Sequence, residues 1–162
     1  MVSIEVLKGF DLFAGLSDDE LKDIARVATE HVCEKGTLSF AEGGKAENLE
    51  LVRNGQVAIE FHIRRLSKHA KVTIIVLGPG RVFGWSALVE PGILTASARC
   101  VERTQIIKVR ATDLIDIFEE NNHIGYVVMK NLAATISSRL RRTREKLALQ
   151  MPGADQTDAN PC

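Results

Sequence analysis

The sequence lacks net charge, long apolar runs and clustered metal-binding residues. Its 162 residues include 21 Lys and Arg against 21 Asp and Glu, so no overall charge attracts the chain to nucleic acid or an anionic membrane. Any anion site must therefore be local. The longest apolar runs, such as residues 73–77, are far shorter than the roughly 20 residues of a membrane-spanning helix, and the acidic N-terminus does not resemble a signal peptide. We expect a cytoplasmic protein with one main domain and no membrane partner.

Cysteine and histidine occur without the spacings that bridges or metal sites use. Cys33, Cys100 and Cys162 are odd in number, widely spaced and without a CxxC motif, so the sequence suggests neither a disulfide framework nor a zinc site. We expect Cys33 and Cys100 to be small buried apolar residues. Three scattered cysteines are too few for an iron–sulfur cluster, and the four histidines lack HxH or HExxH spacing. No metal and no certain cofactor is predicted.

The chain passes from helical to strand periodicity and back to helical periodicity. Residues 16–31 open with Ser17 as N-cap and Glu20 three positions later, a capping-box pattern that predicts a short amphipathic helix. From about residue 31 to 109, short runs rich in Val, Ile and Thr are separated by Gly-containing turns. The expected fold class is mainly β with flanking helices: a β-roll or jelly-roll barrel (double-stranded β-helix) with an N-terminal helix and a long C-terminal helix.

The C-terminal part is predicted to be one long helix over residues 122–149, followed by a polar, disordered tail over residues 151–162. The apolar positions of the helix follow spacings of three, four and seven and form one stripe: Ile124, Val127, Val128, Leu132, Ile136, Leu140 and Leu147. Because so long a helix projects beyond a small domain, a second copy of the chain is the simplest cover for this stripe, and we expect a homodimer. The alternative is a stripe that packs wholly on the parent sheet.

Six short motifs follow one another along the chain: LFAGLSDDEL at 12–21, KG at 35–36, EGG at 42–44, LELVRNGQVAI at 49–59, GPGRVFG at 78–84 and SRLRRTREKL at 138–147. Their order resembles the cyclic nucleotide-binding domain family, and the last motif is similar to the long helix of the bacterial catabolite activator protein. The resemblance covers about residues 10–150. It implies a regulatory domain with cyclic AMP or cyclic GMP as its ligand.

In this family the segment after FG is the phosphate-binding cassette, where a short helix presents backbone N–H groups to the cyclic phosphate. The two polar anchors of that pattern are missing here. Trp85 stands where the family has the Glu that accepts hydrogen bonds from the ribose, and Leu94 where it has the Arg that pairs with the phosphate. Losing a charge-assisted phosphate contact should weaken binding by about a hundredfold or more. If the site is functional, the resemblance implies ligand contacts at Gly84, Trp85, Ser86, Ala87, Leu94, Thr95, Ala96 and Thr143.

Several other residues offer partial substitutes for the missing anchors. Arg81 and Arg99 are the nearest arginines in sequence and could act as the phosphate partner, although Arg99 is two residues beyond the cassette's small-residue run. Thr143 falls where the catabolite activator protein places a helix hydroxyl against adenine, but it also fits an ordinary helix surface. The basic residues between 139 and 146 favour a solvated helix face.

Three functions are compatible with these patterns. The first is a stand-alone, homodimeric regulatory module with a degenerate cassette that binds cyclic AMP or cyclic GMP weakly or not at all. The second is a working sensor of a cyclic nucleotide or another small effector that acts on a separate partner protein. The third, an enzyme on a cupin-like barrel, has no nucleophile–base pair in its favour. Because only twelve residues follow residue 150, we do not expect a helix-turn-helix domain or sequence-specific DNA binding.

Overall fold

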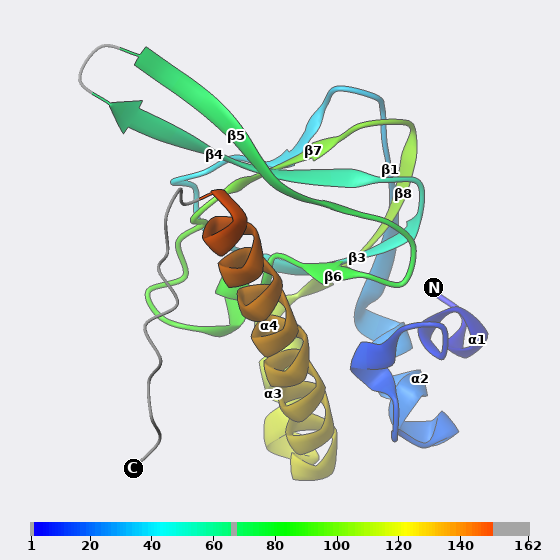
Figure 1. The fold of residues 1–162 in the computed structure, drawn as a ribbon. Helices are drawn as coiled ribbons and strands as arrows, with labels where there is room; N and C mark the ends of the chain where they lie inside the picture. The colour runs from blue at the N-terminus through cyan, green and yellow to red at the C-terminus, as the bar shows by residue number, and fades with distance from the viewer. Residues whose placement is uncertain (1, 66–67, 151–162) are drawn as a thin grey trace, which may run out of the picture.

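The computed structural model describes residues 2–65 and 68–150 of the chain (Figure 1). The helical elements are α1 (Ile4–Leu7), η1 (Asp11–Phe13), α2 (Asp18–Val27), η2 (Trp85–Leu88), α3 (Ala111–Glu120) and α4 (Asn122–Gln150). The strands are β1 (Ala28–Cys33), β2 (Leu38–Phe40), β3 (Asn48–Asn54), β4 (Val57–Arg65), β5 (Lys68–Leu77), β6 (Val82–Phe83), β7 (Ser97–Cys100) and β8 (Thr104–Arg110). The predicted tail over 151–162 lies outside the described residues.

The strands form two four-stranded antiparallel sheets. One sheet has the order β1-β8-β3-β6 and the other the order β2-β7-β4-β5. The chain changes sheet at each connection between successive strands except the β4–β5 hairpin, so the two sheets wind around each other rather than form separate layers. This arrangement confirms the predicted β-roll with an N-terminal helix and a long C-terminal helix.

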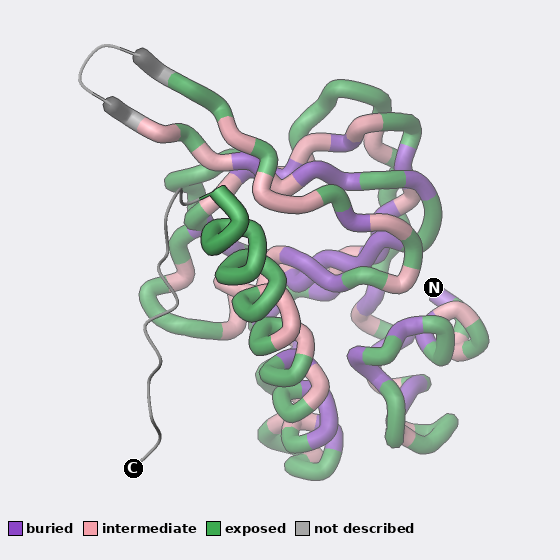
Figure 2. The backbone as a smooth tube through the Cα atoms, viewed as in Figure 1, coloured by how far each residue is buried: buried purple, intermediate pink, exposed green. Residues whose placement is uncertain are grey.

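Two groups of buried side chains hold the elements together. The space between the two sheets is filled by Val52, Val57, Leu77, Phe83, Ala98, Cys100 and Ile106. The helices pack on the outer face of the first sheet, where residues such as Ile24 of α2, Leu114 of α3 and Ile124 of α4 are fully buried. Figure 2 shows this burial along the lower turns of α4, while the turns near its C-terminal end are exposed on all sides. The helical layer therefore fixes only the first half of α4.

Helix α2 begins as predicted but ends four residues earlier. The Ser17 hydroxyl accepts from the Glu20 N–H, and the Glu20 carboxylate accepts from the Ser17 N–H at 2.8 Å, which completes the predicted capping box. The sequence pattern extended this helix to residue 31, whereas Ala28 already begins β1 and pairs with Val109 of β8. Pairing along β8 satisfies the backbone of residues 28–33, and this tertiary contact outweighs the local helical periodicity.

Glu20 links the start of α2 to the start of α4, and it should make stability depend on pH. Its carboxylate accepts from the Ser17 N–H and contacts Nδ1 of His123 at 2.6 Å, and these contacts lower the pKa of Glu20 from 4.5 to about 2. The stabilisation is fully present above about pH 4.5 and is lost as pH falls toward 2. Glu20→Gln should therefore cost about 1–2 kcal/mol at pH 6 and almost nothing near pH 2, as measured by urea unfolding. A cost that stays constant with pH would contradict this assignment.

The prediction that the cysteines form no disulfide was wrong, whereas Cys100 is fully buried as expected and Cys33 is partly buried. Cys33 at the end of β1 and Cys100 at the end of β7 form a disulfide across a Cα–Cα distance of 6.3 Å. The bond joins the two sheets, because β1 and β7 belong to different ones. The sequence carried no signal for this pair, since 67 residues separate the cysteines and only the winding of the roll brings them together. Cys162 lies outside the described residues.

Candidate functional site

The candidate site is the cassette that follows β6, and a glycine sets its direction. Gly84 has φ 75°, and a Cβ at this position would lie 2.8 Å from the Asn48 carbonyl oxygen of β3. Any side chain would therefore be strained and would collide with the neighbouring strand. The glycine lets the chain turn sharply from β6 into the single turn η2, which carries Trp85 and Ser86.

The structure brings six of the eight predicted site residues to one small cavity. Its lining includes Gly84, Trp85, Ser86, Leu94, Thr95 and Ala96. Ala87 lies instead in the wall of a larger neighbouring cleft. Thr143 lines neither space, because it is exposed on α4 and its hydroxyl donates to the Arg139 carbonyl oxygen within the helix at 2.9 Å. A ligand role for Thr143 has no geometric support in this arrangement.

Leu94 is held firmly where the family pattern has an arginine. Its N–H donates to the Gly44 carbonyl oxygen at 2.9 Å, and its own carbonyl oxygen accepts from the Gly43 N–H at 2.8 Å. These bonds fix its backbone against the EGG turn at 42–44. The side chain is only 6% exposed, so it forms an apolar wall of the cavity and offers no charge to a phosphate.

Arg139 of α4 is the site residue that the sequence interpretation missed. Its guanidinium lies over the Trp85 ring, 4.5 Å from the ring centre, and it also donates to the Val82 carbonyl oxygen. Such a cation–π contact contributes about 0.5–2 kcal/mol. Burial, together with the charges of Arg81 and Arg142, lowers the pKa of Arg139 to about 10, so the group stays protonated at neutral pH. The cassette therefore contacts a positively charged side chain, but that side chain belongs to α4 and not to the cassette itself.

The sequence held one signal for this placement. Arg139 follows Val128, Leu132 and Thr135 at helical spacings of four, three and four, and the first two of these are buried against the domain. It therefore continues the face of α4 that packs on the roll. The expectation of a solvated face for the whole basic run was wrong at this residue, whose side chain is half-buried.

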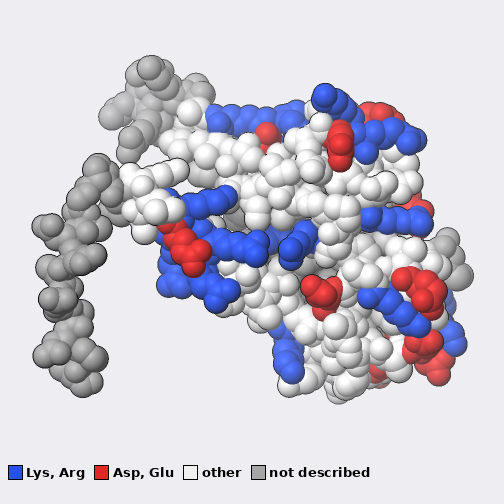
Figure 3. Space-filling model, turned by 45° about the vertical axis from the view of Figure 1, so that its right-hand side comes forward, with Lys and Arg blue, Asp and Glu red and all other residues white. Residues whose placement is uncertain are grey.

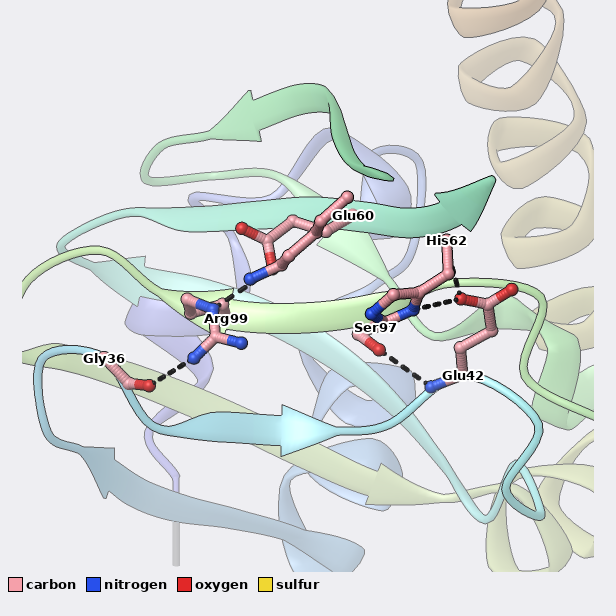
Figure 4. A network of polar contacts seen from close by, with 7 residues as sticks. Gly36, Glu42, Glu60, His62, Ser97 and Arg99 are labelled. Atoms are coloured by element: carbon pink, nitrogen blue, oxygen red, sulfur yellow. Dashed lines mark hydrogen bonds and ion pairs between the residues drawn. The ribbon is translucent and has the colours of Figure 1, made fainter. Parts of the chain in front are cut away.

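Arg99 cannot serve as a substitute phosphate partner, because it is committed to another contact. Its Nε lies 3.1 Å from the Glu60 carboxylate and one terminal nitrogen donates to the Gly36 carbonyl oxygen at 2.6 Å (Figure 4). Burial raises the pKa of Glu60, but the charges and hydrogen bonds of Lys71 and Arg99 outweigh it and hold the pKa below its usual value. Glu60 thus stays ionised and keeps Arg99 in place.

The strand that leaves the cassette is tied to the EGG turn at a second point. The Ser97 hydroxyl of β7 accepts from the Glu42 N–H at 2.9 Å, and the Glu42 carboxylate accepts from the His62 N–H at 3.0 Å (Figure 4). Ser97 is buried. These bonds fix the position of β7 relative to the turn, so the wall that contains Leu94 is a rigid part of the roll.

The sequence of this chain matches a known protein family. The model of the cyclic nucleotide-binding domain matches residues 30–121. The chain belongs to this family. A solved structure from Geobacter metallireducens, whose name describes a cyclic nucleotide-binding protein, is 34% identical to this chain and has a TM-score of 0.74. The match covers 86% of this chain and 99% of that one. The family membership confirms the fold class and the family that the motif order implied.

The chain is also similar to a cyclic AMP receptor protein and to a second solved domain. The cyclic AMP receptor protein of Thermus thermophilus is 29% identical over 144 residues, which are 88% of this chain and 63% of the relative. The chain thus spans less than two thirds of that protein's length. A cyclic nucleotide-binding domain from Methylobacillus flagellatus shares the fold with a TM-score of 0.79 at 18% identity over 93% of this chain and 83% of that one.

Across residues 2–65 and 68–150, no three His, Cys, Asp or Glu side chains come together in a way that could hold a metal ion. None of the described helices is long and apolar enough to pass through a bilayer.

Proposed function

We propose that this chain is a homodimeric regulatory module whose cassette is closed to cyclic AMP and cyclic GMP. The observation that carries the proposal is the contact of the Arg139 guanidinium with the Trp85 ring in a cavity that Leu94 also lines. The two residues that replace the family's polar anchors line the cavity, and a side chain from α4 fills part of the remaining space. The proposed module covers residues 10–150, including the dimerisation helix at 122–149, and has no enzymatic activity.

The size of the cavity supports a closed site. Its volume is about 80 Å³, whereas sites for small ligands occupy about 300–1,000 Å³. A nucleotide would have to displace the Trp85 ring and Arg139 from each other before it could enter. It would then meet the apolar side chain of Leu94 where an anion needs a cation. Both the displacement and the missing ion pair weaken binding.

The exposed half of α4 supports the homodimer. Ile136, Leu140 and Leu147 follow heptad spacing and are 37%, 57% and 57% exposed. Thr143 occupies the intervening position of the same seam, and Met129 and Ala133 continue it toward the N-terminus of the helix. Apolar residues at heptad spacing on an exposed helix are the pattern that pairs two helices in a coiled coil. The second copy expected from the sequence therefore has a defined surface on which to pack.

Cellular location is a separate expectation. The sequence predicts a cytoplasmic protein, but a disulfide is uncommon in a reducing cytoplasm. The Cys33–Cys100 bond therefore gives the cytoplasmic prediction no support. Thiol titration of protein purified under alkylating conditions would test whether this bond forms in the cell.

The proposed closure is tested by titrating the purified protein with cyclic AMP and cyclic GMP. Isothermal titration should detect no binding at ligand concentrations up to about 100 μM. A dissociation constant of that size corresponds to a binding free energy of roughly −5.5 kcal/mol. Trp85 is the one tryptophan in the chain and its ring lies in the cavity wall, so its fluorescence would report a bound nucleotide. Because no nucleotide binds, this fluorescence should stay unchanged. Micromolar binding of either nucleotide would reject the closed cassette and favour the alternative, a nucleotide sensor that acts on a separate partner protein.

A further inference from the structure

A second cavity is lined by Arg139, which also lines the cassette cavity. This cleft has a volume of about 620 Å³, within the range of small-ligand sites, and runs between α4 and the segment from β5 to the turn before β6. We call it the α4 cleft. Its walls include Asp11, Arg81, Ala134, Ser138, Arg139 and Arg142. The cleft is separate from the cassette cavity, and Arg139 is the residue that lines both.

The α4 cleft carries an excess of positive charge. Arg81, Arg139 and Arg142 line it against a single carboxylate, Asp11. In the described part of the chain, none of these three arginines forms an ion pair with a carboxylate. Figure 3 shows Lys and Arg side chains gathered where α4 passes the strands, with few acidic side chains among them. On a chain without net charge, this concentration is a local feature of one surface.

The guanidinium groups of Arg81 and Arg142 each repel that of Arg139. Arg81 and Arg142 both act to lower the pKa of Arg139, in addition to the effect of burial. Like charges gathered in a concave, partly desolvated site destabilise the folded protein and are relieved by an anion. Guanidinium groups also bind phosphate and carboxylate oxygens through paired N–H donors, so the set is suited to an anion with several such oxygens.

We propose that the α4 cleft binds a small polyanion, of the class that carries two or more linked phosphate groups, between Arg81, Arg142 and Arg139. The Ser138 hydroxyl lines the same wall and adds a neutral hydrogen-bonding group. Because Arg139 also covers Trp85, an anion in the cleft competes for the same guanidinium. Binding would draw Arg139 toward the cleft and change the surroundings of the Trp85 ring. This proposal does not depend on whether the cassette is closed.

The probe for this site is inorganic pyrophosphate, titrated at constant ionic strength against sodium chloride, with Trp85 emission and melting temperature as readouts. We expect a saturable change in Trp85 emission and a rise in melting temperature, with inorganic phosphate at least tenfold weaker. Arg81→Gln and Arg142→Gln should each weaken the pyrophosphate effect by at least tenfold. Neither residue lines the cassette cavity, so these variants distinguish the cleft from a pyrophosphate bound at the cassette. Arg141→Gln is the matched control, since this arginine is exposed on the same helix and lies outside the cleft.

The outcomes separate a built site from general attraction to charge. Without pyrophosphate, Arg81→Gln and Arg142→Gln should leave the melting temperature unchanged or raise it, because each removes a repulsive charge. The proposal fails if pyrophosphate changes neither readout. It also fails if Arg141→Gln reduces the effect as much as Arg142→Gln, because binding would then follow helix charge rather than the cleft.

Discussion

The double substitution Trp85→Glu with Leu94→Arg should convert a protein that ignores cyclic AMP at 100 μM into one that binds it at micromolar concentration, a gain of at least a hundredfold. Removing the indole ring opens the space that Arg139 and Trp85 now fill, and the new carboxylate can pair with the Arg139 guanidinium that now lies over the ring. The arginine introduced at position 94 would project from a backbone already fixed at the cavity wall. Isothermal titration with cyclic AMP measures the gain.

A control for this experiment lies one residue away. Ile93→Arg adds the same charge beside the cassette, but Ile93 is 50% exposed and does not line the cavity, so this variant should not bind cyclic AMP. Leu94 is buried, and circular dichroism must first show that the double variant folds with a cooperative melting transition. If the folded double variant still ignores cyclic AMP, these two substitutions are not what closes the site. The rest of the cassette, or Arg139 itself, would then be responsible.

The fold could be predicted from the sequence because its signals are local and occur in order. The capping box of α2, the Gly-containing turns and the FG motif before the cassette each depend on a few adjacent residues. Gly84 shows why such a motif is reliable: the turn requires a positive φ, and a close strand leaves no room for a Cβ. The absence of the two polar anchors was visible in the same way, since each is a single position within a motif.

The features that the sequence did not reveal depend on contacts between distant segments. Cys33 and Cys100 meet only because β1 and β7 lie in different sheets that the roll brings together. The apolar stripe of α4, predicted as one, is divided between two surfaces in the structure. Leu132 is buried in the helical layer, whereas Leu140 is exposed beyond it. Periodicity identifies apolar positions on a helix, but it does not tell where the parent domain ends along it.

Arg139 occupies the boundary between these two surfaces, and this position explains why its role was missed. It lies seven residues after buried Leu132 and directly before exposed Leu140. In sequence it is one member of a basic run, and only the position of the roll decides that it packs on Trp85. Because it also lines the α4 cleft, the same residue connects the cassette, the cleft and the first exposed turns of α4. Arg139 thus adjoins both cavities and directly precedes Leu140 of the proposed dimer seam.

The second large effect concerns that seam: Ile136→Asp combined with Leu140→Asp should convert the protein from dimer to monomer. Each buried Leu or Ile side chain contributes about 1.5–3 kcal/mol, and a twofold interface would lose four such side chains and gain four carboxylates facing one another. The dissociation constant should rise by at least a hundredfold, measured by sedimentation equilibrium across a concentration series. Arg141→Asp, at an exposed position that belongs neither to the seam nor to the lining of the α4 cleft, should leave the dimer intact.

The monomeric variant also distinguishes packing of the α4 stripe on a second copy from packing on the roll of its own chain. Ile136 and Leu140 are exposed in the single chain, so their replacement should leave its melting transition nearly unchanged once dimerisation is accounted for. A large loss of monomer stability would instead mean that these side chains pack on their own roll, as the alternative interpretation of the stripe holds. If the natural chain sediments as a monomer at all concentrations, the exposed seam is not a homodimer interface.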